Sequence, residues 1–134
     1  MKRSIGTFFA GLLTWVVVVS LIDRGLRLLI PGYVVAESQL QFTLGMMAAR
    51  LGMAALTSLV AGAVVGVLSS SVRLPWLLGA LILAVFLPEH IHVWHQLPVW
   101  YHLTFLLTLV PLVVLGAHLT RRAHGSAEVA LPRT

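Results

Sequence analysis

The sequence predicts an all-α integral membrane protein with four transmembrane helices in a small up-down bundle. Three observations predict this fold class. Hydrophobic residues make up 59% of the 134 residues and charged residues only 10%, against roughly 25% charged in an ordinary soluble domain. The apolar residues form long uncharged runs, and the basic residues lie between those runs. A soluble chain of this length leaves too much surface exposed to bury so many apolar side chains.

The first expected span covers residues 4–22, an uncharged run that begins directly after Arg3. A helix needs about 20 apolar residues to cross a bilayer, so this run is long enough. The helix can continue to Ile30, where Pro31 and Gly32 end it. The end of the run lacks the small residues of a signal-peptide cleavage site, so we interpret it as a retained anchor.

The second expected span covers residues 47–68, which carry no charge after Arg50. Ser38 and Gln41 have the three-residue spacing of a capping box, which predicts a helix start near Gln39. This helix is therefore expected to be longer than the span that it contains.

The third and fourth expected spans cover residues 74–91 and 99–119. The uncharged core of the third, residues 74–88, would reach only ~22 Å as a helix, against ~30 Å of hydrocarbon. Apolar residues after position 90 can extend it, and an even number of spans places both basic ends of the chain on one side. Residues 121–134 are polar, and we expect a disordered cytoplasmic tail there.

The distribution of basic residues predicts that both termini lie in the cytoplasm. The positive-inside rule counts Lys and Arg in the short segments between spans. This orientation places more basic residues inside than outside, and we expect a bacterial inner membrane from the small size and compactness of the chain. The inside residues are Lys2, Arg3, Arg73, Arg121, Arg122 and Arg133, and the outside residues are Arg24, Arg27 and Arg50.

Several function classes are excluded by composition. The chain has no cysteine, which excludes disulfides, cysteine-ligated zinc, iron–sulfur clusters and thiol catalysis. The net charge of +5 is divided among the segments between apolar runs, so we expect no nucleic-acid binding. The sequence contains no glycine-rich phosphate loop, and its acids do not lie mid-span. We therefore expect a protein that is not an enzyme.

Small residues form a stripe along the second span, mostly three or four residues apart. In lipid, helices associate through close backbone approach and van der Waals contact. The stripe therefore predicts a helix-packing face, used either within the chain or against another chain. It consists of Gly45, Ala48, Gly52, Ala55, Gly62 and Gly66.

Histidines gather between the third and fourth spans. Histidine is a common ligand of copper and zinc, and a carboxylate can join a zinc site. A copper or zinc site on the outer face would use His90, His92 and His95, completed by Glu89 or His102. The alternatives are a polar interfacial loop and a pH-sensitive patch. A haem is not expected within a single chain, because the spans do not offer histidines on facing helices at similar depth.

Arg50 lies near the outer end of the second span. A charge inside a span is costly and points to a function by default. Asp23 and Glu89 flank the same face, so we expect an ion pair of Arg50 with one of them. Asp23 and Arg27 have the four-residue spacing of an ion pair on one helix.

These observations favour a small non-catalytic accessory or structural subunit, without a cofactor, in the lipid bilayer. It would pack as a homo-oligomer or with a larger membrane complex through the small-residue stripe. A second hypothesis is a copper- or zinc-binding membrane protein that uses the histidine cluster. A third is a small transporter or channel with Arg50 near its mouth.

Overall fold

The computed structural model describes residues 2–130, and it describes side chains for residues 4–123. Within residues 2–130 the chain forms helices and connections, without a strand. Four of the helices are long and apolar enough to cross a membrane, which confirms the predicted all-α architecture. The helices are α1 Lys2–Leu29, α2 Tyr33–Gln39, α3 Leu44–Leu68, α4 Arg73–His92 and α5 Val99–Ala130.

Each of the four long helices contains one of the predicted spans. The third predicted span has the shortest uncharged run, but the structure shows that its helix is long enough to cross a bilayer. Helix α4 has 20 residues, which reach about 30 Å at the usual rise per residue. That length matches the hydrocarbon core of a bilayer.

The start of α3 differs from the predicted capping box. The helix begins at Leu44, and the Thr43 hydroxyl caps it by accepting a hydrogen bond from the Met46 amide at 3.3 Å. Ser38 lies instead in the short helix α2, which ends at Leu40 in a left-handed conformation with φ 54°. This reversal of backbone direction prevents α2 from continuing into α3, because left-handed residues end helices.

The end of α5 also differs from the prediction. Residues 121–130 continue the helix as far as Ala130, although we expected disorder from residue 121. The stretch contains no proline before Pro132, so no residue in it lacks the backbone N–H that a helix needs. The predicted disorder of residues 131–134 lies outside the described residues.

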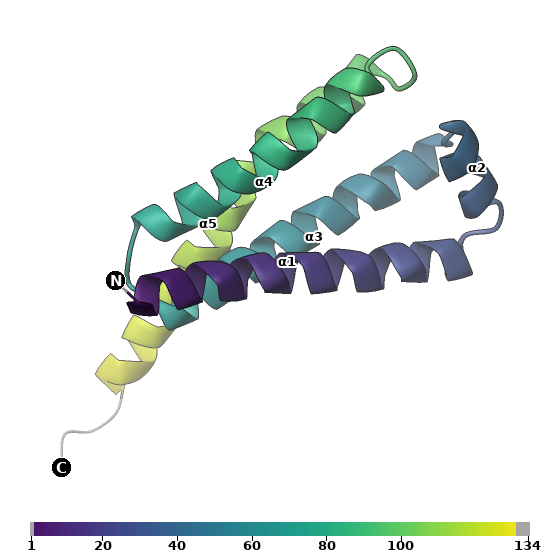
Figure 1. Ribbon diagram of the computed structural model, residues 1–134. Helices are drawn as coiled ribbons and strands as arrows, with labels where there is room; N and C mark the ends of the chain where they lie inside the picture. Colours follow the sequence, from purple (N-terminus) through teal and green to yellow (C-terminus); the bar gives the residue numbers. More distant parts are fainter. Residues whose placement is uncertain (1, 131–134) are drawn as a thin grey trace.

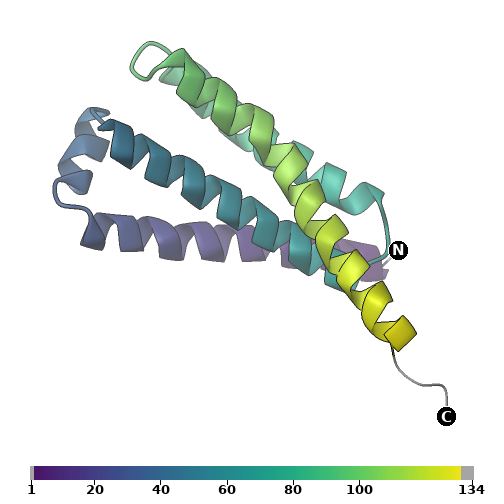
Figure 2. The same cartoon turned by 180° about the vertical axis from the view of Figure 1, so that it is seen from behind.

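Helix α3 lies at the centre of the bundle (Figure 1). It packs on α1 and α5, and α4 packs mainly on α5 while also touching α1 and α3. Both termini lie at the end opposite α2, as the view from behind also shows (Figure 2). Towards α2, the α4–α5 pair diverges from the α1–α3 pair. We call the half that contains α2 and the α4–α5 connection the open half, and the opposite half the close-packed half.

Glycines bring the backbones of α3 and α5 into contact in the close-packed half. A methyl group on Gly62 would overlap the carbonyl of Val113, and one on Gly116 would overlap the carbonyl of Leu59. A methyl group on Gly66 would likewise overlap the backbone of α5. Close approach of this kind is how helices associate where lipid removes the hydrophobic driving force. This contact fixes the crossing point from which the open half diverges.

Candidate binding pocket

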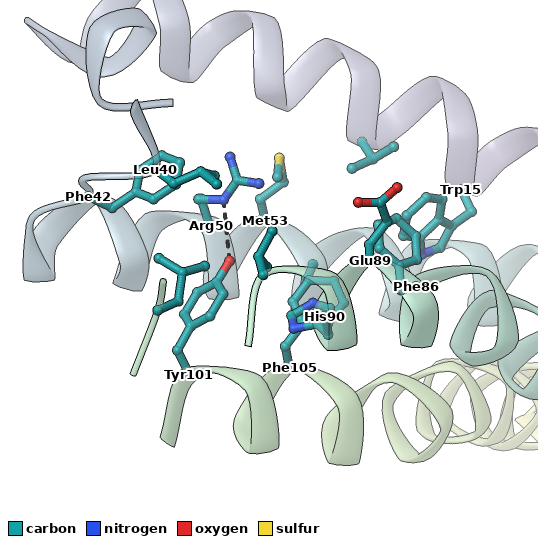
Figure 3. A pocket seen from close by; sticks show the side chains of 14 residues that line it. Trp15, Leu40, Phe42, Arg50, Met53, Phe86, Glu89, His90, Tyr101 and Phe105 are labelled. Atoms are coloured by element: carbon teal, nitrogen blue, oxygen red, sulfur yellow. Dashed lines mark hydrogen bonds between the residues drawn. The ribbon is translucent and has the colours of Figure 1, made fainter. Parts of the chain in front are cut away.

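A pocket of about 280 Å³ lies in the open half, between the α1–α3 pair and the α4–α5 pair (Figure 3). Every one of the four long helices contributes to its wall, together with the connections on either side. The lining residues are Trp15, Val19, Leu40, Phe42, Arg50, Met53, Ala54, Phe86, Glu89, His90, Val93, Leu97, Tyr101 and Phe105.

Aromatic rings form a continuous part of the pocket wall. The ring centroids of Trp15 and Phe86 lie 5.2 Å apart, and those of Phe86 and Phe105 lie 5.4 Å apart. Trp15 is buried and donates a long hydrogen bond of 3.4 Å from its indole nitrogen to the Ser58 hydroxyl. Ring pairs at these separations are mutually stabilising, so the wall is held by contacts between three helices.

Arg50 is held at the pocket wall by four partners. Its Nη1 donates to the Tyr33 hydroxyl at 2.9 Å, and its Nε donates to the Tyr101 hydroxyl at 3.2 Å. The Glu37 carboxylate lies 3.5 Å from Nη1, and the guanidinium carbon lies 4.7 Å from the ring centre of Phe42. The charge of Arg50 is therefore largely satisfied within the chain.

The ion pairs around Arg50 differ from the predicted ones. Arg50 pairs with Glu37, whereas we expected Asp23 or Glu89. Asp23 pairs instead with Arg27, at 2.8 Å over one helical turn, and Arg27 reaches Glu37 at 3.1 Å. The reason is α2, which folds between α1 and α3 and presents Glu37 to both arginines. Glu37 is the acid that sequence reasoning missed.

Tyr33 anchors α2 to this network. Its side chain is fully buried and packs with Ala36 and Met46. Burial raises the pKa of the Tyr33 phenol above its usual value, while the Arg50 charge acts in the opposite direction. The phenol is therefore neutral near pH 7, and its oxygen accepts the hydrogen bond from Arg50.

Two histidines meet beside the pocket, but they are not the predicted set. His90 Nδ1 and His102 Nδ1 lie 2.8 Å apart, and both side chains are buried. His92 and His95 are exposed. Helix α4 continues through His92, so a residue two positions after His90 points away from it. Within the described residues, no group of three or more His, Asp or Glu side chains could hold a metal ion.

A sequence signal for the inward position of His90 does exist. Leu78 and Ile82 are buried in the core, and Phe86 packs against the same core. His90 continues this series at a spacing of four residues, which keeps side chains on one face of a helix. The apolar stripe of the third span therefore extends onto a histidine that faces α5.

The hydrogen bond between the histidines restricts their protons. One Nδ1 must donate and the other must accept. His102 Nε2 is buried and has no partner among the described residues, so a proton there would be an unsatisfied donor. We infer that His102 carries its proton on Nδ1 and donates to His90. His90, which lines the pocket, then carries its proton on Nε2.

Glu89 is the acidic residue of the pocket wall. Figure 3 shows it beside Trp15 and Phe86, and Phe86 lies one helical turn before it on α4. Within residues 4–123, the Glu89 side chain makes no hydrogen bond and no ion pair. The pocket thus contains one arginine that is satisfied and one carboxylate that is not.

No family model, curated protein or solved structure matches the chain. The chemistry of the pocket is therefore the basis for a function. Its wall is mainly aromatic and aliphatic, with the charged or polar groups of Arg50, Glu89, His90 and Tyr101. Pockets of this composition bind ligands through an apolar body and a few polar contacts.

The small-residue stripe is divided between two roles. Gly62 and Gly66 pack on α5 within the chain. Gly45, Ala48 and Gly52 are exposed, and a methyl group on Gly52 would meet nothing within 4 Å. Ala55 lies between these parts and is half-buried. Only the part nearest α2 is free to contact another chain.

Proposed function

We propose that this chain is a small multi-pass membrane protein that binds a lipid-like ligand without chemical conversion. The pocket of about 280 Å³ in the open half is the observation that carries this proposal. Its size lies near the lower end of the range for ligand pockets, roughly 300–1,000 Å³. Such a volume suits a single alkyl or aromatic chain better than a whole two-chain lipid.

The surface around the pocket favours a ligand that arrives from the bilayer. Val16, Val17 and Leu21 of α1 are exposed apolar side chains on the helix that forms one wall. Many other large apolar side chains of the four long helices are exposed as well. In a bilayer these side chains contact lipid, so a hydrophobic molecule approaches the bundle without crossing water.

A neutral photoreactive probe tests this function. We would incubate the protein in dodecyl maltoside with a long-chain alcohol that carries a diazirine, irradiate it, and locate the label by peptide mass spectrometry. Label is expected on pocket residues. Val19→Trp fills the pocket from α1, because Val19 lines it, and should abolish that label. Val17→Trp adds the same side chain at an exposed position and should leave the label in place. Equal pocket labelling in both variants would contradict the proposal.

A second candidate function, as an accessory subunit that packs with itself or a larger complex, is favoured by the exposed part of the stripe. Gly45, Ala48 and Gly52 leave the α3 backbone open to a neighbouring helix. If they form an interface, Gly52→Leu lowers the oligomeric state in mild detergent, measured by native mass spectrometry. An unchanged assembly in Gly52→Leu would remove this candidate.

We also propose that both termini face the cytoplasm of a bacterial cell. The support is the excess of Lys and Arg in the segments at the terminal end of the bundle. A reporter enzyme that is active only outside the cytoplasm, fused after Thr134, should be inactive. The same reporter inserted between Gln39 and Phe42 should be active.

A further inference from the structure

We infer that the pocket selects a lipophilic ammonium cation. The head of this ligand lies between the Glu89 carboxylate and the aromatic wall, and its apolar body occupies the rest of the pocket. The inference rests on the proposed binding function and names the ligand class that the pocket takes.

The charges around the pocket leave Glu89 uncompensated. Asp23, Arg27, Glu37 and Arg50 form a chain of ion pairs at 2.8, 3.1 and 3.5 Å. Two acids and two bases give this chain a formal charge of zero. The Glu89 carboxylate has no partner among the described residues, so the pocket wall together with this chain of ion pairs carries a formal charge of −1.

An anionic head fits the same wall poorly. It would need Arg50, whose Nη1 and Nε already donate to Tyr33 and Tyr101 and whose charge already faces Glu37. It would also have to lie in the same pocket as the Glu89 carboxylate. Like charges at short range disfavour binding, so the pocket should discriminate against carboxylates and phosphates.

The aromatic wall supplies a second contact for a cation. Trp15, Phe86 and Phe105 form a connected set of rings that line the same pocket as Glu89. A cation within about 6 Å of a ring centre is attracted by the negative face of the ring, most strongly by tryptophan. A carboxylate beside aromatic faces is therefore suited to an ammonium group.

The position of Glu89 on α4 fits an amphiphile. Glu89 lies within one turn of the helix end at His92. In a bilayer, a charge near a helix end costs less than one at the centre, because it reaches the interface. The ammonium group would then lie at headgroup depth and the apolar body would lie below it. A free lipophilic amine and an amine-bearing lipid headgroup share this chemistry.

Three matched probes test the inference. They carry the same diazirine-bearing alkyl chain and end in an amine, an alcohol or a carboxylate. Dodecyl maltoside is neutral and contains no amine, so the micelle does not compete. We expect the amine to label the pocket about tenfold more than the alcohol, which corresponds to about 1.4 kcal/mol, and the carboxylate to label it least.

The variant Glu89→Gln should reduce amine labelling to the level of alcohol labelling in the same variant. Glu89 is exposed and unpaired within the described residues, so the variant should keep the elution volume and melting temperature of the wild type. Asp23→Asn is the matched control, because Asp23 does not line the pocket. It should leave the preference for the amine intact.

The possible outcomes separate the two proposals. Equal labelling by amine and alcohol in the wild type, or an amine preference that survives Glu89→Gln, would overturn the cation inference. Alcohol labelling that disappears in Val19→Trp would still support the pocket.

Competition then identifies the source of the ligand. Displacement by phosphatidylethanolamine supports a lipid headgroup, displacement by dodecylamine alone supports a free amine, and displacement by neither overturns the inference.

Discussion

The distance between neighbouring helices is set by different residues in the two halves of the bundle. In the close-packed half, Gly62 and Gly116 place the backbones of α3 and α5 in direct contact. In the open half, large rings such as Trp15 and Phe86 stand between the helices, and Arg50 joins α2, α3 and α5 through hydrogen bonds and an ion pair. Small residues fix where the helices cross, and large and polar residues determine the space that remains. A pocket can therefore exist in a chain this short because the packing is concentrated at its other end.

The largest expected loss of stability is that of one of two glycine variants of α3. Gly62→Ala places a methyl group against the Val113 carbonyl, whereas Gly52→Ala meets nothing within 4 Å. Overpacking typically costs about 1–3 kcal/mol, and backbone contacts yield less than side chains. Gly62→Ala should therefore lower the melting temperature in dodecyl maltoside by several degrees, and Gly52→Ala should not lower it. Equal melting temperatures would mean that the close-packed half is not held by this contact.

The next largest loss of stability is expected from replacing an arginine of the open half. Arg50→Gln leaves the buried hydroxyls of Tyr33 and Tyr101 without their donor and should cost about 1–3 kcal/mol. Arg27→Gln breaks pairs of a side chain that is 47% exposed and should cost about 0–1 kcal/mol. Thermal unfolding of the two variants measures the difference. A larger loss in Arg27→Gln would show that Arg50 does not hold the open half together.

A smaller effect follows from the histidine pair. His102→Phe removes the ring nitrogen that meets His90 Nδ1 at 2.8 Å and should cost about 1 kcal/mol of unfolding free energy. His92→Asn changes an exposed side chain and should change the unfolding free energy by less than about 0.5 kcal/mol. Thermal unfolding in dodecyl maltoside measures both, and equal losses would contradict the pairing of His90 with His102.

The smallest expected change in stability concerns two neighbouring polar residues of α3. The Thr57 hydroxyl is buried without a partner among the described residues, so Thr57→Val should change stability by less than about 0.5 kcal/mol. Ser58→Ala removes the acceptor of the Trp15 indole and should cost about 0.5–1.5 kcal/mol. Unfolding in detergent at one pH is sufficient for both. A marked loss in Thr57→Val would contradict the absence of a hydrogen-bond partner for this hydroxyl.

The spans were predictable because the thickness of a bilayer imposes a minimum length on apolar runs. The helix start at Leu44 was not, because Ser38 and Thr43 are both good capping residues. The choice between them depends on the left-handed backbone of Leu40, a conformation that leucine rarely adopts. Local sequence carries no signal for it.

The site was predictable in its residue types and not in its pairings. A charge at Arg50 indicated a polar region near the end of the second span, but its partner Glu37 lies on a short helix whose direction depends on two left-handed residues. The series from Leu78 to His90 could have indicated the inward histidine. The pocket itself depends on how far the helix pairs diverge, which no single segment of the sequence determines.

Saturable binding is the most direct test of the pocket in the open half. We would titrate dodecylamine into the protein in dodecyl maltoside and count bound molecules by native mass spectrometry. The account predicts that the wild type and Val17→Trp saturate at one molecule per chain and that Val19→Trp, which fills the pocket, binds none. Binding that does not saturate, or that persists unchanged in Val19→Trp, would contradict it.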